Sequence, residues 1–376
     1  MKLVYYSSVL NHHQRCLCDA FYALLGENFR FIQTNPMEQQ RIELGYQQEE
    51  APYVIKSYES EDKRILAERL AVEADVMLAA VFPVKLLYER MRQNKLTFRH
   101  IETYFKRGKY RLLSPNAMRI AWMEHTRYRK KPLYLLCASA HTAKDVSLFG
   151  AYPDKKFKWG YFPPLETPED VHVCRSGNEK TEFLWCGRML EWKKPMHAIR
   201  TVQKLREKGY DVHLNLIGTG PDVDELKTYV ENERLTQLVT FCGPMPPEQV
   251  RQYMRQADVF FFTSTRQEGW GAVLNEAMNS GCAVLASGEA GATGYLVKHG
   301  ENGLIYKHNS LNQLIGLAEK LCNDRNTMRT LGTEAAGTIM EQWNYRTAAE
   351  RLVNTSQALL DERKPRSYEN GPMSMA

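Results

Sequence analysis

The segment that decides the fold is ADVFFFTSTRQEGWGAVLNEAMNSGCAVLAS, residues 257–287. It predicts a buried strand that ends at Ser264, a short loop, and then a helix over residues 272–279. Two glycines of the loop, Gly269 and Gly271, let the backbone approach an anion closely because glycine has no β-carbon. Since a new apolar run follows the helix, the segment is typical of a sheet with helices on its faces.

The same alternation of elements runs through the whole chain. Short apolar runs predict strands over residues 3–9, 29–33, 53–58, 75–81, 110–114, 133–139, 157–162, 182–187, 213–218, 239–243, 259–264, 282–287 and 303–306. Apolar residues at helical spacing predict helices over residues 66–74, 195–209, 222–232, 247–257, 311–323 and 345–363. Because many strand runs are apolar throughout, we expect parallel sheets covered on both faces. The fold class is therefore α/β, with two doubly wound, Rossmann-like domains.

The boundary between the two domains is predicted at residues 166–180, where prolines, acids and small polar residues gather. Residues 1–165 would form the N-terminal domain and residues 181–345 the C-terminal domain. Residues 346–376 would add a last helix and, from residue 364, a polar tail that we expect to fray.

Composition excludes several classes of protein. With 376 residues, 43% hydrophobic and 25% charged, the chain is expected to fold rather than to remain disordered. Its longest apolar runs, 76–82 and 132–140, are shorter than the roughly 18 residues that span a bilayer. The N-terminal stretch lacks the pattern of a secretory signal. We therefore expect a cytoplasmic protein whose eight cysteines, none in a C-x-x-C pair, are free thiols.

Two glutamates of the deciding segment, Glu268 and Glu276, are separated by the seven residues GWGAVLN. This E-x7-E pattern closely resembles the signature of retaining glycosyltransferases of family GT4, which have the GT-B fold. The resemblance covers residues 180–350, and further matching motifs occur in order and spacing: WCGRMLEWKKP (185–195), LIGTGPDVDELK (216–227), VTFCGPMPPEQVRQYMRQADVFFFTS (239–264) and HGENGLIY (299–306).

The resemblance assigns roles to individual residues. Arg188 and Lys193 would hold the diphosphate of the donor, with Lys194 as an alternative to Lys193. Glu276 would accept hydrogen bonds from the ribose of the nucleotide, and Glu268 would contact hydroxyls of the donor sugar. Gly269, Trp270 and Gly271 would line the sugar and phosphate pocket, and Val273 and Leu274 would lie near the phosphate and ribose. The base pocket would be formed partly by Phe241, Cys242 and Gly243.

Cations at a diphosphate are also chemically sensible, because cleavage of a sugar–phosphate bond builds negative charge on the departing nucleotide. Since Arg188 and Lys193 would neutralise that charge, we expect no metal and no cofactor besides the nucleotide-sugar substrate. Asp222 and Asp224 look like a metal-binding D-x-D motif. We interpret them instead as a helix start, with Asp222 as N-cap and Glu225 as its capping-box partner.

In the N-terminal half, His12 and His13 directly follow the first predicted strand. Either histidine could bind a phosphate or relay a proton, and we count His13 among the catalytic candidates. The alternative is a polar turn in which Asn11 caps the next helix. His12 and Glu102 are the candidates for contacts with the acceptor.

Basic residues are concentrated between residues 85 and 131, where 14 Lys or Arg stand against three acids in a chain of net charge +6. Such an excess predicts an anionic partner. No known nucleic-acid-binding pattern accompanies it, so we expect no nucleic acid. Two interpretations stay open: a solvated basic face, or, given the family resemblance, a surface for anionic lipid headgroups or a lipid-pyrophosphate acceptor on the inner face of the plasma membrane.

As a whole, the resemblance implies two domains that face each other across a cleft, with the acceptor bound by residues 1–165 and the donor by residues 181–345. The last helix would pack back toward the first domain. The implied reaction moves a sugar, with retention, from a UDP- or GDP-sugar to a hydroxyl of a glycan or lipid-linked acceptor in cell-surface polysaccharide synthesis. Two alternatives remain: a nucleotide-sugar epimerase of the same architecture, and a sugar-nucleotide binding module without catalysis.

Overall fold

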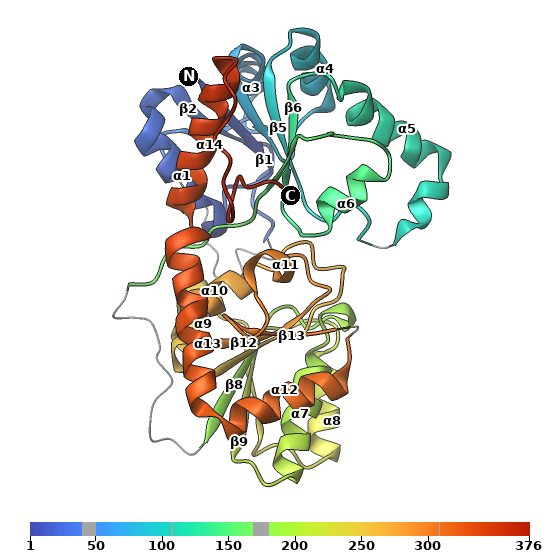
Figure 1. Cartoon of the computed structure of the whole chain (residues 1–376), viewed down its shortest axis with the longest axis vertical. Helices are drawn as coiled ribbons and strands as arrows, with labels where there is room; N and C mark the ends of the chain where they lie inside the picture. The colour runs from blue at the N-terminus through green and yellow to red at the C-terminus, as the bar shows by residue number, and fades with distance from the viewer. Residues whose placement is uncertain (40–49, 107, 168–179, 308) are drawn as a thin grey trace. The chain divides into compact units, whose positions relative to one another are not determined.

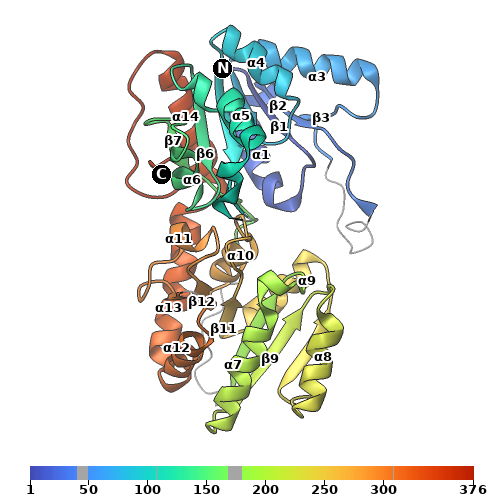
Figure 2. The same cartoon turned by 90° about the vertical axis from the view of Figure 1, so that its right-hand side faces the viewer.

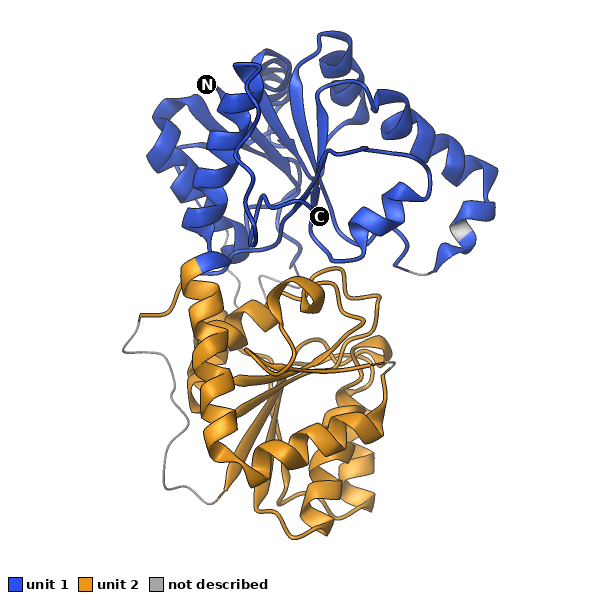
Figure 3. Ribbon diagram, in the orientation of Figure 1, with its two compact units in different colours: residues 1–43, 47–164, 342–376 blue, residues 44–46, 165–341 orange. Residues whose placement is uncertain are grey.

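The computed structural model describes residues 1–39, 50–106, 108–167, 180–307 and 309–376. These residues form two compact units, which Figure 3 shows in blue and orange. Unit 1 takes in the described chain up to residue 164 together with residues 342–376, and unit 2 takes in residues 165–341. Most of the predicted linker, residues 166–180, lies outside the described residues. Among the helices described, none has both the length and the apolar character needed to cross a membrane.

Unit 1 is built on a seven-stranded parallel sheet of order β3-β2-β1-β4-β5-β6-β7. The central strands β1 and β4 are buried along their whole length, as expected for a sheet with both faces covered. The strands are β1 (Leu3–Ser7), β2 (Phe29–Gln33), β3 (Val54–Lys56), β4 (Val76–Ala79), β5 (Leu96–Ile101), β6 (Leu133–Cys137) and β7 (Lys156–Lys158).

Helices of unit 1 cover this sheet. The last helix of the chain, α14 (Tyr345–Leu360), packs against α1 (His12–Leu25), and Figure 1 shows the two side by side. Helix α3 (Glu61–Glu73) contacts α4 (Val84–Arg92), and both contribute to an apolar core with β1, β2 and β4. Two shorter helices, α5 (Pro115–Glu124) and α6 (Thr142–Ser147), complete the unit.

The C-terminal tail is ordered, so the prediction that residues 364–376 fray is wrong. Met373 and Ser374 are buried. The amide of Met373 donates to the carbonyl of Lys158 at 2.9 Å, and the amide of Lys158 donates to the carbonyl of Ser374 at 2.8 Å. The tail therefore pairs with the edge strand β7, and backbone pairing of this kind does not depend on an apolar sequence.

Unit 2 is built on a six-stranded parallel sheet of order β10-β9-β8-β11-β12-β13. Phe183 of β8 lies opposite Leu214 of β9 on one side and Val259 of β11 on the other. With the sheet of unit 1, this confirms the predicted α/β class of two doubly wound sheets. The strands are β8 (Thr181–Cys186), β9 (Val212–Ile217), β10 (Val239–Gly243), β11 (Val259–Phe262), β12 (Ala283–Ser287) and β13 (Leu304–Tyr306).

Helices also cover the sheet of unit 2. Side chains of α7 (Pro195–Glu207), α8 (Val223–Asn232) and α12 (Leu311–Asn323) share one apolar core with the strands, and Figure 2 shows α7 beside β9. Helix α10 (Val273–Asn279) contacts both α9 (Pro247–Gln256) and α13 (Arg325–Gly337). A short helix, α11 (Thr293–Leu296), precedes β13.

Two local predictions fail for identifiable reasons. Residues 110–114, predicted as a strand, lie largely in a 3₁₀ helix, Lys109–Leu113. In addition, the strand β5 was not predicted, because Arg99 and His100 interrupt its apolar pattern. Asp222 does occupy the N-cap position of α8, but its side chain makes no capping hydrogen bond. Its amide donates instead to the carbonyl of Met189 at 3.2 Å, so the capping box is not formed.

Candidate active site

The candidate active site of unit 2 lies at the carboxyl ends of β8 and β11. The strand order reverses between these two neighbours, because β9 follows β8 on one side of the sheet and β12 follows β11 on the other. Loops that diverge at such a switch point leave room for a ligand. Here the two loops are residues 187–194 after β8 and residues 263–272 after β11.

An ion pair joins the two loops. The ammonium group of Lys193 lies 2.7 Å from the Oε2 atom of Glu268, and the side chains are only 15% and 12% exposed. The hydroxyl of Ser264 donates to the same oxygen at 3.0 Å. Lys193 has three N–H donors and this pair uses one of them. The pair therefore orients the Glu268 carboxylate while leaving donor capacity on the lysine.

Further hydrogen bonds hold the backbone of the loops in place. The hydroxyl of Thr263 donates to the carbonyl of Lys193 at 2.6 Å and accepts from the indole of Trp185 at 2.9 Å. The amide of Thr265 donates to the carbonyl of Trp192 at 2.9 Å. Because the anchoring groups are buried or partly buried, the geometry of the ion pair is set by the scaffold rather than by the ion pair itself.

Glycines permit the close approach of the chain at this site. A β-carbon on Gly218, at the end of β9, would stand 2.0 Å from the carbonyl oxygen of Gly187. On Gly271, whose φ is +92°, a β-carbon would stand 2.3 Å from the ring of Phe262. The fold therefore requires glycine at position 271, whether or not this residue also contacts a ligand.

The other two cations predicted at the diphosphate differ in their surroundings. Arg188 directly follows Gly187, is exposed, and has no hydrogen bond or ion pair within the described part of the chain. Lys194 has a left-handed backbone with φ of 53°, and its ammonium group lies 3.8 Å from the Glu191 carboxylate. The structure therefore pairs Lys193, and not Lys194, with Glu268.

Glu276 lies in the first turn of α10 and is buried. Burial raises the pKa of its carboxyl group to about 7, while the charge of Arg251 lowers that pKa and the charge of Glu166 raises it. Glu166 is itself held by α9: its Oε2 atom lies 2.5 Å from the guanidinium of Arg255, and its Oε1 atom lies 3.5 Å from that of Arg251. The environment of Glu276 thus keeps its protonation state sensitive to pH near neutrality.

Two residues predicted to contact the donor, Trp270 and Leu274, have buried side chains. The indole of Trp270 donates to the Oδ1 atom of Asn275 at 2.8 Å, and Leu274 is fully buried. Their side chains therefore pack inside unit 2, and a ligand could meet only their backbone. Val273 and Gly271 are partly exposed, whereas Gly269 is buried.

The predicted base pocket lies at the carboxyl end of β10. Phe241, Cys242 and Gly243 are all partly exposed there, and the ammonium group of Lys227 lies 6.0 Å from the centre of the Phe241 ring. The carbonyl of Gly243 accepts a hydrogen bond from the amide of Gly218 at 2.9 Å. These contacts place the three residues at the same edge of the sheet as the loop after β8.

In unit 1, His12 and His13 are the first two residues of α1, and their ring centres lie 3.7 Å apart. The side chain of Asn11 accepts a hydrogen bond from the amide of His13 at 3.0 Å, which confirms that Asn11 caps this helix. Capping and a functional role for the histidines are compatible, because the cap uses the backbone amide of His13 and not its ring.

Tyr161 links His13 to Glu102. Its hydroxyl donates to the Oε1 atom of Glu102 at 2.8 Å, and its ring lies 6.5 Å from the ring of His13 and 5.6 Å from that of His100. Burial lowers the pKa of His100 to about 4, so its imidazole is neutral at physiological pH. Sequence reasoning missed Tyr161 and His100; recognising residues 96–101 as a strand would have placed His100 at this edge.

The basic stretch carries exposed apolar side chains beside its charges. Leu113 is 85% exposed, Tyr110 62% and Trp122 57%. Next to them is a hollow of about 720 Å³, lined by Thr103, Tyr104, Lys106, Tyr110, Ser114, Asn116, Ala117 and Ile120. This part of unit 1 therefore combines cations with an apolar surface.

The fold is that of GT-B glycosyltransferases. The chain superposes on the crystal structure of Anabaena Alr3699/HepE in complex with UDP with a TM-score of 0.71 at 17% identity, covering 95% of this chain and 100% of the other. It superposes on an apo form of the lipopolysaccharide outer core galactosyltransferase WaaB with a TM-score of 0.67 at 17% identity, covering 96% of this chain and 100% of that one.

Sequence comparison assigns one segment of the chain to a family. Residues 168–338 match the model of the family glycosyl transferases group 1, so this segment is a domain of that family and the resemblance noted in the sequence is confirmed. An uncharacterized glycosyltransferase, MJ1069, of Methanocaldococcus jannaschii is 27% identical over 50% of this chain and 49% of its own length. A GDP-mannose-dependent alpha-(1-6)-phosphatidylinositol monomannoside mannosyltransferase of Mycobacterium tuberculosis is 23% identical over 47% of each chain. The matches span about half the length of these curated relatives.

Proposed function

We propose that the chain is a retaining glycosyltransferase that moves a sugar from a nucleotide diphosphate sugar to a hydroxyl of an acceptor. The observation that carries this proposal is the pair of Lys193 and Glu268 across the switch point of unit 2. It sets a cation for a diphosphate beside a carboxylate for sugar hydroxyls, and charge-assisted hydrogen bonds to both are strong. The family match of the segment and the UDP bound to Alr3699/HepE support the same chemistry.

The proposed roles follow the surroundings of each side chain. Arg188, exposed and unpaired within the described chain, would bind the diphosphate together with Lys193. Glu268 would orient the sugar, and Glu276, in its ionised form, would accept hydrogen bonds from the ribose. Negative charge that develops on the leaving diphosphate would be stabilised by these two cations. We propose that the leaving phosphate takes the acceptor proton during attack on the front face of the sugar.

Because the chain's own cations would carry the charge of the diphosphate, we propose transfer that requires no metal. Excess EDTA should then leave the rate unchanged. A rate that falls with EDTA and returns with Mg²⁺ or Mn²⁺ would contradict this part of the proposal.

The donor could be a UDP- or a GDP-sugar, because UDP is bound to Alr3699/HepE and GDP-mannose is used by the mycobacterial relative. A thermal-shift screen with UDP, GDP, ADP and CMP would identify the base, since a bound nucleotide raises the melting temperature by mass action. Release of that diphosphate from candidate nucleotide sugars is then measured with and without acceptors.

The outcome of this assay separates transfer from its alternatives. Release stimulated by an acceptor supports a glycosyltransferase, interconversion of nucleotide sugars without release supports an epimerase, and binding alone supports a module without catalysis. Glu268→Gln keeps the size of the side chain and removes its charge, so transfer should fall by roughly 100-fold, as for loss of one preorganised electrostatic contact.

For the acceptor, we propose a glycan or lipid-linked molecule used in cell-surface polysaccharide synthesis and bound by unit 1. The cluster of His13, Glu102 and His100 around Tyr161 supplies polar contacts for hydroxyl groups. The exposed side chains of Leu113 and Trp122, set among cations, support contact with anionic lipid headgroups.

This surface can be tested with vesicles of phosphatidylcholine with and without phosphatidylglycerol. Binding should increase with the anionic lipid, weaken with salt, and fall for Leu113→Ser. Ile65→Ser is the matched control, because Ile65 lies on α3 of the same unit and is also exposed, at 53%. Equal binding to neutral and anionic vesicles, or equal loss in both variants, would overturn the assignment.

A further inference from the structure

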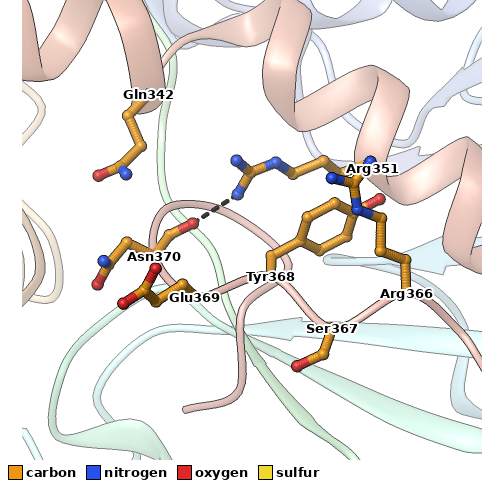
Figure 4. Close-up of a pocket in the computed structure, with 7 residues that line it drawn as sticks. All are labelled: Gln342, Arg351, Arg366, Ser367, Tyr368, Glu369 and Asn370. Carbon is orange, nitrogen blue, oxygen red and sulfur yellow. Dashed lines mark hydrogen bonds between the residues drawn. The ribbon is translucent and has the colours of Figure 1, made fainter.

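A second hollow, of about 370 Å³, lies in unit 1 between α14 and the C-terminal tail, and no residue proposed for sugar transfer lines it. Its size falls within the range of small-ligand pockets, roughly 300–1,000 Å³. Figure 4 shows the residues that line it: Gln342, Arg351, Arg366, Ser367, Tyr368, Glu369 and Asn370.

Two arginines converge on one aromatic ring in this hollow. The guanidinium carbon of Arg351 lies 4.4 Å from the centre of the Tyr368 ring, and that of Arg366 lies 5.7 Å from it. A guanidinium group carries five N–H donors, which lie in its plane. Because Arg351 uses only its Nη1 atom in hydrogen bonds to residues that the structure describes, both side chains keep N–H donors for an acceptor.

The two cations are not neutralised by a carboxylate. Arg351 donates to the carbonyls of Asn370 at 2.5 Å and Pro372 at 3.0 Å, which are uncharged. Arg366 has neither an ion pair nor a hydrogen bond to any residue that the structure describes. Glu369 is the one acid among the lining residues, and Figure 4 shows its side chain pointing away from Arg366.

Like charges held close to one another destabilise a fold unless an anion or a polar contact offsets them. Burial lowers the pKa of Arg351, and the charge of Arg366 contributes to the same shift. Planar guanidinium groups match the oxygen atoms of a phosphate better than any other side chain.

We propose that this hollow binds a phosphate group, as the free ion or on a small molecule. The binding residues are Arg366 and the remaining N–H donors of Arg351. Since residues 366–370 belong to the tail, the site exists only while the tail is docked on α14 and paired with β7. Phosphate binding and tail docking are therefore coupled, and each stabilises the other.

The test uses the full chain and inorganic phosphate in HEPES buffer at constant ionic strength, with affinity measured by titration calorimetry. Arg366→Ala should weaken the binding at this site by about tenfold, the loss expected for one charge-assisted contact. Arg363→Ala is the matched control: Arg363 lies in the same tail, carries the same charge and is paired with Asp361 at 2.7 Å, outside the hollow. Arg363→Ala should keep the wild-type affinity.

A second readout follows the tail itself. Phosphate should slow the removal of C-terminal residues by carboxypeptidase in the wild-type chain and in Arg363→Ala, but not in Arg366→Ala. Because Arg366 is exposed, its replacement is not expected to unfold unit 1, and the melting temperature without phosphate checks this. Equal phosphate affinity in all three proteins, with no protection of the tail, would overturn the proposal.

Discussion

The replacement Gly218→Ala tests how the candidate active site of unit 2 is held together. Gly218 has φ of +122°, and a β-carbon on it would stand 2.0 Å from the carbonyl oxygen of Gly187. The amide of Gly187 donates to the carbonyl of Ile217 at 3.0 Å, and that of Gly218 donates to the carbonyl of Gly243 at 2.9 Å. An alanine must therefore push the Gly187 peptide away by about 1 Å, and Arg188 moves with it.

The expected cost has two parts. The positive φ alone costs about 1–3 kcal/mol for a residue with a β-carbon. Overlap with a backbone atom adds about 1–3 kcal/mol, as for other overpacked positions. Gly209→Ala separates the two parts, because Gly209 also has a positive φ, +91°, while no atom lies within 4 Å of its virtual β-carbon.

The assay compares melting temperatures and nucleotide affinities of both variants with those of the wild-type chain. With about 2–4 °C per kcal/mol, Gly218→Ala should melt roughly 2–12 °C below Gly209→Ala. It should also bind the donor nucleotide about tenfold more weakly, since displacement of Arg188 removes a charged contact. Gly209→Ala should keep the nucleotide affinity. If the two variants melt together and both bind normally, the loop after β8 is not positioned by this contact and the reasoning fails.

Three further predictions address other parts of the chain. Burial raises the pKa of Glu276 to about 7, and the ionised form is proposed to bind ribose. Nucleotide affinity, measured by calorimetry, should therefore be about tenfold lower at pH 6 than at pH 8, and Glu276→Gln should remove this difference. Arg90 is fully buried and donates to carbonyls at the end of α3, so Arg90→Met should lower the free energy of unfolding in urea by about 3 kcal/mol with nucleotide affinity unchanged. Lys193→Met should weaken nucleotide binding and destabilise unit 2 by about 2 kcal/mol, and a double-mutant cycle with Glu268→Gln should show coupling; additive effects would contradict the ion pair.

Much of unit 2 could be predicted from the sequence because its elements obey local rules. The strand ending near Ser264, the glycine loop and the helix over residues 273–279 all lie within one segment. The spacing of Glu268 and Glu276 is likewise visible along the chain. What the sequence could not show is that Lys193, 75 residues before Glu268, donates to it, because that contact depends on β8 and β11 being neighbours in the sheet.

Unit 1 was harder to predict because its polar residues interrupt the patterns. The strand β5 carries Thr97, Arg99 and His100, all buried, so it does not read as an apolar run. Partners for these groups come from other elements: the hydroxyl of Thr97 accepts from the side chain of Arg90 at 2.9 Å. A buried polar strand is stable only with such partners, and they cannot be identified before the topology is known.

The C-terminal tail was mispredicted for a related reason. A polar, glycine-containing segment has little apolar surface to bury, and by composition alone it should remain solvated. In the fold, its backbone instead meets the unpaired edge of β7, and Arg351 binds the carbonyls of Asn370 and Pro372. The hydrogen-bond partners that order the tail are thus supplied by the rest of unit 1.

The two candidate sites differ in how their residues are distributed along the sequence. At the donor site of unit 2, most predicted groups lie in two short segments, residues 188–194 and 268–276, each carried by one loop after one strand. The polar cluster around Tyr161 gathers His13, His100 and Glu102 from the ends of different strands and connections. When the residues of a site lie in one or two short loops, their spacing can be recognised in the sequence. When they come from the ends of several strands, the sequence shows only isolated polar residues. The residues that bind the acceptor therefore have to be identified with variants of unit 1 chosen from the structure. The first is Tyr161→Phe, which keeps the ring and removes the hydroxyl that donates a hydrogen bond to Glu102.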